Sequence, residues 1–264
     1  MLVSDVYYEI LLCKFVIKNL QMFRHRGKGR TYFHNLKLAS ILSTVAGIVN
    51  ITGVLATQTL TTNVTGHFAY FSEQLFLMNY HIAFNYLYYI LFFLLGAFVS
   101  GLIMEWAVKH RSYISYIVPI SIEIFIMLSI VFASILFPAG PRLLSAFIVS
   151  ALLFAMGLQN ALVTRVSQSV VRTTHLTGLF TDLGIELSQL FFYKLKPDRI
   201  KLNKSIFLKL MIIGCFFLGG MIGGLGYQYF ELQMLLIPVG LLFFALWYDH
   251  LMLQFYNLKR KLIH

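Results

Sequence analysis

Six stretches of this chain are long and apolar enough to cross a lipid bilayer. They cover residues 38–57, 83–104, 114–136, 143–164, 210–229 and 232–253. A spanning helix needs about 20 mostly apolar residues, and inside hydrocarbon only a helix or a closed barrel satisfies its backbone polar groups. Charged residues make up 12% of the sequence, whereas soluble domains carry about 25%. The sequence therefore predicts an all-α integral membrane protein with six transmembrane helices.

Two shorter helical segments, residues 63–78 and 175–193, begin with nearly the same phrase. The run Thr61–Gly66 reads TTNVTG, and the run Thr173–Gly178 reads TTHLTG. Both segments carry charged and amide side chains, so they are doubtful as full spans. We expect two short or re-entrant helices, each starting at a repeated phrase.

The repeated phrase belongs to a longer internal repeat. Matching features precede and follow it in the same order: Gly47 and Asn50 with Gly157 and Asn160, Gly96 with Gly219, and Pro119 with Pro238. The two copies are predicted to cover residues 36–137 and 138–256. Internal repeats of this size are typical of membrane transporters.

The distribution of Lys and Arg predicts how often each copy crosses the membrane. With six crossings and a cytoplasmic N-terminus, every Lys and Arg except Arg142 lies on the cytoplasmic side, as the positive-inside rule prefers. If the two short segments also crossed, Lys109, Arg111, Arg165 and Arg172 would move outside. Three crossings per copy is an odd number, so the second copy is expected to be inverted relative to the first.

The ends of the chain and one connecting stretch complete the predicted organisation. Residues 1–35 form a basic extension that includes an amphipathic segment at 6–23, and residues 257–264 form a basic cytoplasmic tail. Residues 194–209 are predicted to be a cytoplasmic loop. The net charge of +11 is assigned to these cytoplasmic segments rather than to nucleic-acid binding, because membrane proteins concentrate Lys and Arg there.

The repeated phrases predict a binding site at two helix starts. Threonine can cap free backbone N–H groups, and glycine lets a ligand or another backbone approach closely. Residues 58–62 reach roughly 16 Å when extended, about half the hydrocarbon thickness. Two helix N-termini near the midplane would favour an anion or a carboxylate. The predicted substrate-binding residues are Asn50, Thr61, Thr62, Thr65, Gly66, Asn160, Thr173, Thr174, Thr177 and Gly178.

These small and polar residues also have a structural interpretation. Threonine and glycine allow close helix packing, and asparagine pairs join neighbouring helices by hydrogen bonds. The glycine runs that begin at Gly96 and Gly219, with Gly101 after the first, favour close helix contact over a hinge.

Three acidic residues are candidates for ion or proton coupling: Glu123, Asp182 and Glu186. Glu123 lies in the middle of a predicted span, where an ionised carboxylate costs about 3 kcal/mol or more unless it is paired, protonated or hydrated. We expect it to face protein or water, with threonine hydroxyls, Asn50 or Asn160 as candidate partners. For Asp182 and Glu186, a solvated helix edge is the alternative.

The sequence offers no positive feature for an enzyme. It contains no phosphate-binding loop and no nucleophile elbow. His67 and His175 lack the spacing and the neighbouring ligands of a shared metal site. We expect no catalytic residues, no cofactor and no metal.

Parts of the second copy resemble a known family. Residues 157–161 (GLQNA), 171–178 (VRTTHLTG) and 182–184 (DLG) resemble the YoaK-like family of bacterial inner-membrane proteins, domain of unknown function 1275. Thr65 and Gly66 resemble the first threonine-glycine motif of that family, and the likeness covers about residues 36–256. The resemblance implies a multi-pass protein of the bacterial inner membrane and supplies no substrate.

Together these features favour a secondary transporter or permease for a small, preferentially anionic solute. The expected partners are the lipid bilayer and that solute, and a homo-oligomer is left open. A passive channel built on the same site is one alternative. A non-transporting membrane scaffold, whose polar core only specifies packing, is another. The acidic candidates favour coupled transport over passive flow, because protonatable groups can link two gradients.

Overall fold

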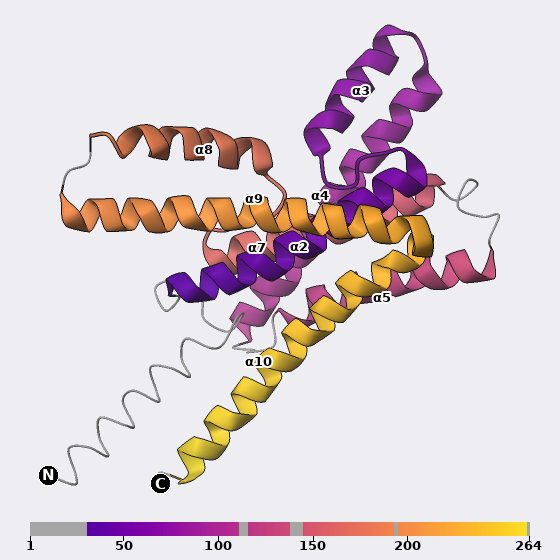
Figure 1. Ribbon diagram of the computed structural model, residues 1–264. Coiled ribbons are helices and arrows are strands. Elements are labelled where there is room, and N and C mark those ends of the chain that lie inside the picture. Colours follow the sequence, from indigo (N-terminus) through magenta and orange to yellow (C-terminus); the bar gives the residue numbers. More distant parts are fainter. Residues whose placement is uncertain (1–30, 111–115, 138–144, 193–194, 263–264) are drawn as a thin grey trace, which may run out of the picture.

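The computed structural model describes residues 31–110, 116–137, 145–192 and 195–262 (Figure 1). Every regular element in these ranges is a helix. They are α2 (Tyr32–Thr57), α3 (Val64–Phe76), α4 (Tyr80–Lys109), α5 (Ile117–Leu136), α7 (Ser145–Ser167), α8 (Leu176–Gln189), α9 (Lys196–Phe230), the short 3-10 helix η2 (Glu231–Leu235) and α10 (Leu236–Leu262). The amphipathic segment predicted at 6–23 lies outside the described residues.

Five stretches of these residues are long and apolar enough to cross a membrane. Four of them are α2, α4, α5 and α7, and the fifth runs from Lys196 to Leu251 through α9, η2 and α10. The predicted all-α, multi-pass membrane class is confirmed. The fifth stretch covers 56 residues, which include the predicted span 210–229 and most of the predicted span 232–253.

The prediction of a loop at residues 194–209 is wrong, because α9 already begins at Lys196. Pro197 occupies the first turn, where its missing N–H costs nothing, and Asp198 suits the positive end of the helix dipole. Leu202 and Ile206, one turn apart, pack with Leu183 of α8 in a small apolar cluster. This contact with another helix stabilises a stretch whose composition alone resembles a loop.

Two long helix pairs form the centre of the molecule: α2 packs along α9, and α4 packs along α7 (Figure 1). Glycines make both crossings close. A Cβ on Gly47 would lie 2.1 Å from the carbonyl oxygen of Phe216, and a Cβ on Gly157 would lie 2.2 Å from that of Phe93. Only glycine permits such a close approach of two backbones.

The partner helices contribute glycines to the same two crossings. A Cβ on Gly219 would lie 2.3 Å from the carbonyl oxygen of Thr44, and one on Gly96 would lie 2.0 Å from that of Phe154. Close packing at Gly96 and Gly219 is therefore confirmed. The prediction of close packing at Gly101 is wrong, because no heavy atom lies within 4 Å of the position that a Cβ would take there.

The helices α2 and α7 run antiparallel where they meet. The side-chain Nε2 of Gln159 donates to the carbonyl oxygen of Leu42 over 2.9 Å. Further along α2, a Cβ on Gly53 would lie 3.2 Å from Cδ1 of Leu152. An early residue of α2 thus meets a late residue of α7, and a late one meets an early one.

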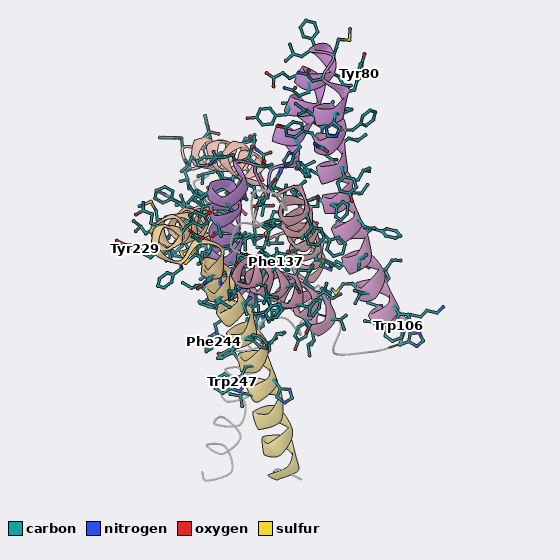
Figure 2. All side chains as sticks on the ribbon, turned by 90° about the vertical axis from the view of Figure 1, so that its right-hand side faces the viewer. Tyr80, Trp106, Phe137, Tyr229, Phe244 and Trp247 are labelled. Atoms are coloured by element: carbon teal, nitrogen blue, oxygen red, sulfur yellow. The ribbon has the colours of Figure 1, made fainter. Side chains whose placement is uncertain are left out.

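The outer surface of the bundle carries many large apolar side chains. Figure 2 shows Tyr80 and Trp106 near the two ends of α4, and Phe244 and Trp247 on α10. Trp106 and Phe244 are 63% and 51% exposed. Such a surface suits a lipid bilayer, and aromatic residues near helix ends suit its interfaces.

Candidate functional site

The two helices that precede the repeated phrases are each followed by a residue with positive φ. Gln58, after α2, has φ 56°, and Gln168, after α7, has φ 54°. A residue in this left-handed region ends a helix and redirects the chain. The N–H of Gln58 donates to the carbonyl oxygen of Val54 over 2.8 Å, which closes the last turn of α2. After each of the two helices, the chain then returns alongside the helix it has left.

An asparagine holds each returning loop against its helix. Oγ1 of Thr62 donates to Oδ1 of Asn50 over 2.9 Å. In the second copy, Nδ2 of Asn160 donates to Oγ1 of Thr174 over 2.7 Å. The two bonds join residues that match in the predicted sequence repeat. They show that both asparagines position the phrases.

The first threonine of each phrase, Thr61 or Thr173, is buried next to the threonine that bonds to the asparagine. Thr61 donates to the carbonyl oxygen of Val49 over 3.4 Å. Thr173 donates to Oδ1 of Asn160 over 3.2 Å and accepts from Gln159 over 3.4 Å. Both threonines are fully buried. They support the loop and do not line the cavity described next.

The starts of α3 and α8 and the two long helix pairs border an open cavity of about 580 Å³. Its lining includes six pairs of residues that match in the predicted sequence repeat: Asn50 and Asn160, Thr62 and Thr174, Asn63 and His175, Val64 and Leu176, Thr65 and Thr177, and Phe93 and Phe216. Leu60, Thr164 and Arg172 complete the lining. The two phrases, far apart in sequence, thus face one space.

The glycines of the phrases serve the helix starts and do not line the cavity. Oδ1 of Asn63 accepts from the N–H of Gly66 over 3.0 Å and caps α3. At the start of α8, a Cβ on Gly178 would lie 2.3 Å from the ring of His175. Gly178 therefore leaves room for the side chain of the residue that precedes its helix.

Glu123 is buried at 1% exposure, so the prediction that it faces protein is confirmed. The predicted partners are wrong, because Asn50 and Asn160 bond to the threonines of their own copies. Glu123 does not reach these residues because it lies on α5. This helix packs on α7, α10 and η2 and contributes no residue to the cavity. Oε1 of Glu123 has no hydrogen-bond partner among the described residues.

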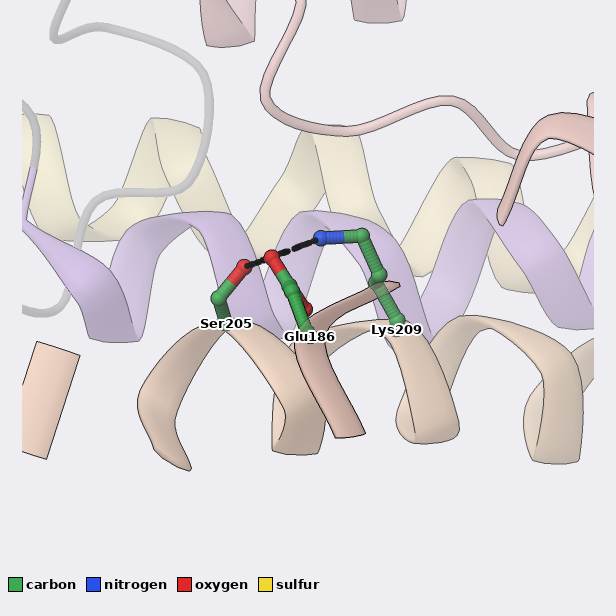
Figure 3. A network of polar contacts seen from close by, with 3 residues as sticks. All are labelled: Glu186, Ser205 and Lys209. Atoms are coloured by element: carbon green, nitrogen blue, oxygen red, sulfur yellow. Dashed lines mark hydrogen bonds and ion pairs between the residues drawn. The ribbon is translucent and has the colours of Figure 1, made fainter. Parts of the chain in front are cut away.

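Asp182 and Glu186 also lie away from the cavity. Asp182 is exposed on α8. Oε1 of Glu186 accepts from Nζ of Lys209 over 2.7 Å and from Oγ of Ser205 over 2.6 Å (Figure 3). The bonds attach α8 to α9, since Ser205 and Lys209 lie one turn apart on α9.

Several cavity residues were missed at the sequence level. Phe93 and Phe216 occupy equivalent places three residues before the matched Gly96 and Gly219, so the repeat alignment could have found them. Asn63 and His175 lie inside the two phrases but differ in type. Arg172 had no counterpart of like charge, because Leu60 is the equivalent residue in the first copy.

The cavity combines hydrogen-bonding side chains with positive electrostatic potential. Val64 and Thr65 begin α3, and Leu176 and Thr177 begin α8, so two helix N-termini border it. Free backbone N–H groups in the first turn give each helix start about half a positive charge. The guanidinium group of Arg172 adds a full positive charge.

Comparisons with known proteins identify a family and nothing beyond it. A family model described as "Protein of unknown function (DUF1275)" matches residues 38–248, so the chain belongs to that family. No curated protein and no solved structure matches the chain.

Proposed function

We propose that this DUF1275 protein is a secondary transporter for a small anionic solute, which binds in the cavity between the first turns of α3 and α8. The observation that carries the proposal is the paired lining of that cavity by equivalent residues of two copies. A transporter built from two copies has its substrate site at their interface, with helix N-termini directed at anionic groups.

The proposal includes two inverted repeats, α2–α5 and α7–α10. The glycine crossings support the repeat. The contact of Gly47 with the backbone of Phe216 corresponds to the contact of Gly157 with the backbone of Phe93. The antiparallel contact between α2 and α7, which are equivalent helices, supports inversion. An axis that exchanges two antiparallel spanning helices lies in the membrane plane, so one site can open to either side in turn.

The lengths of α3 and α8 support re-entrant helices beside six spans. They have 13 and 14 residues, about 20 Å at 1.5 Å per residue, which is too short for 30 Å of hydrocarbon. The charge distribution favours a cytoplasmic location for both termini, and membership of the family supports the bacterial inner membrane.

The lining favours a small anion over a cation or an apolar molecule. Arg172 and two helix N-termini supply positive charge, and the threonine and asparagine groups can donate hydrogen bonds to oxygen atoms. No carboxylate lines the cavity among the described residues.

The proposal is tested by uptake of radiolabelled small anions, including carboxylates, phosphate and sulfate, into proteoliposomes. We expect saturable uptake of at least one anion, and Arg172→Gln should reduce it by about tenfold or more. The matched control is Arg199→Gln, which removes an exposed arginine of α9 outside the cavity. Counterflow, in which unlabelled anion inside drives transient accumulation of label, separates a carrier from a channel. Uptake equal to that of protein-free liposomes for every anion would contradict the proposal.

A further inference from the structure

A second hollow of about 880 Å³ adjoins the solute cavity between α4 and α7. Asn160 and Thr164 line both spaces. Glu105, Arg165, Gln168 and Ser169 line the second hollow only. Asn160 and Thr164 therefore lie between the hollow and the solute cavity.

An ion pair between Glu105 of α4 and Arg165 of α7 lies at the wall of this hollow. The two side chains are 60% and 54% exposed, respectively. Exposed ion pairs contribute little to folding stability, because water and salt screen them. The pair can therefore open at small cost, which leaves Arg165 free to bind another anion.

The ion pair has no equivalent on the other side of the pseudo-symmetric bundle. The corresponding positions are Gln228 on α9 and Leu55 on α2, and neither side chain is charged. Gly101, which shapes the hollow on α4, corresponds to Gly224. If the ion pair only served helix packing, a charged pair would be expected at both crossings. Charges are present only at the α4–α7 crossing, which indicates a role specific to that side.

We propose that the α4–α7 hollow is the access vestibule through which the anion reaches the cavity. Arg165 is its first binding residue, and it exchanges the carboxylate of Glu105 for the incoming anion. This inference rests on the proposed function and adds the route and the residue that favours negative charge. Asn160 and Thr164, with hydrogen-bonding groups facing both spaces, receive the anion at the passage between them.

The test measures thiol labelling at Ala161, which lines the vestibule. The background carries Cys13→Ser and Cys215→Ser. In Ala161→Cys, the rates of reaction with an anionic sulfonatoethyl and a cationic trimethylammonioethyl methanethiosulfonate are compared. Glu105→Gln should raise the anionic-to-cationic rate ratio several-fold, and Arg165→Gln should lower it several-fold. The control is Ile51→Cys, the equivalent position on α2, where neither substitution should change the ratio.

Two results would overturn the inference: no reaction at Ala161→Cys with either reagent, or a ratio that neither substitution changes. If Ala161→Cys does not yield monodisperse protein in detergent, Thr164→Cys provides the same measurement at the passage between the two spaces. The labelling needs no transport. Failure of uptake with the predicted labelling would therefore refute transport and leave only a hollow that favours anions. Uptake without the predicted labelling would refute the vestibule alone.

Discussion

Replacing Gly219 by alanine should destabilise the protein, because Gly219 sets the distance between α2 and α9. The added Cβ would lie 2.3 Å from the carbonyl oxygen of Thr44. That oxygen belongs to the backbone of α2 and cannot rotate away. An ordinary contact begins near 3.4 Å, so the two helices must separate by about 1 Å at a close-packed crossing.

The expected cost follows from overpacking. Inserting a methyl group into a packed interior costs about 1–3 kcal/mol. For a chain of this size that corresponds to a decrease of roughly 2–12 °C in the melting midpoint. Gly214 is a matched control on the same helix, because no heavy atom lies within 4 Å of the position of its Cβ. Gly214→Ala should leave the midpoint unchanged or raise it slightly, since alanine loses less backbone entropy in a helix.

The assay is thermal unfolding of detergent-solubilised protein, followed by size-exclusion chromatography after heating. Double variants extend it. Gly47→Ala and Gly219→Ala act at one crossing, so their effects should sum to less than additive. Gly47→Ala and Gly157→Ala act at different crossings, so their effects should add within about 0.5 kcal/mol. A Gly219→Ala midpoint equal to that of Gly214→Ala would refute the proposed close contact.

Three further predictions concern single side chains. Asn160→Leu removes the bonds to Thr173 and Thr174 and should cost about 1–3 kcal/mol in the same thermal assay; an unchanged midpoint would show that these bonds do not hold the loop. Lys209→Met leaves the carboxylate of Glu186, only 18% exposed, with one fewer partner and should cost about 1–3 kcal/mol; a midpoint at or above wild type would contradict this. Glu123→Leu should preserve or raise the midpoint, because Oε1 is unpartnered among the described residues; Glu123→Gln should alter the pH dependence of any measured uptake, and an identical pH profile would exclude a coupling role.

Much of the fold could be predicted from the chain, because hydropathy and charge are local properties. The apolar runs mark α2, α4, α5 and α7 to within a few residues at most ends. The start of α9 was missed because residues 196–209 are polar on one side and depend on Leu183 of α8 for their packing. A prediction from local composition does not include such contacts between helices.

Only those parts of the candidate site that recur in the sequence repeat could be predicted. The phrases, with Asn50 and Asn160, predicted which loops come together. Which residues of those loops face the cavity depends on helix geometry, and it separates Thr65 and Thr177 from the buried Thr61 and Thr173. Arg172 has no repeat partner of its charge. The pairing of Glu105 with Arg165 joins residues far apart in the chain.

The central claim, one site shared by two inverted copies and open to each side in turn, is tested most directly by labelling from both sides. Thr65→Cys and Thr177→Cys, in the background without Cys13 and Cys215, place single thiols on the two halves of the cavity. In sealed, oriented membrane vesicles, a charged methanethiosulfonate is added either outside or inside. We predict that each thiol reacts from both sides. Reaction of Thr65→Cys from one side only, and of Thr177→Cys from the other side only, would mean two separate half-sites and would contradict the account.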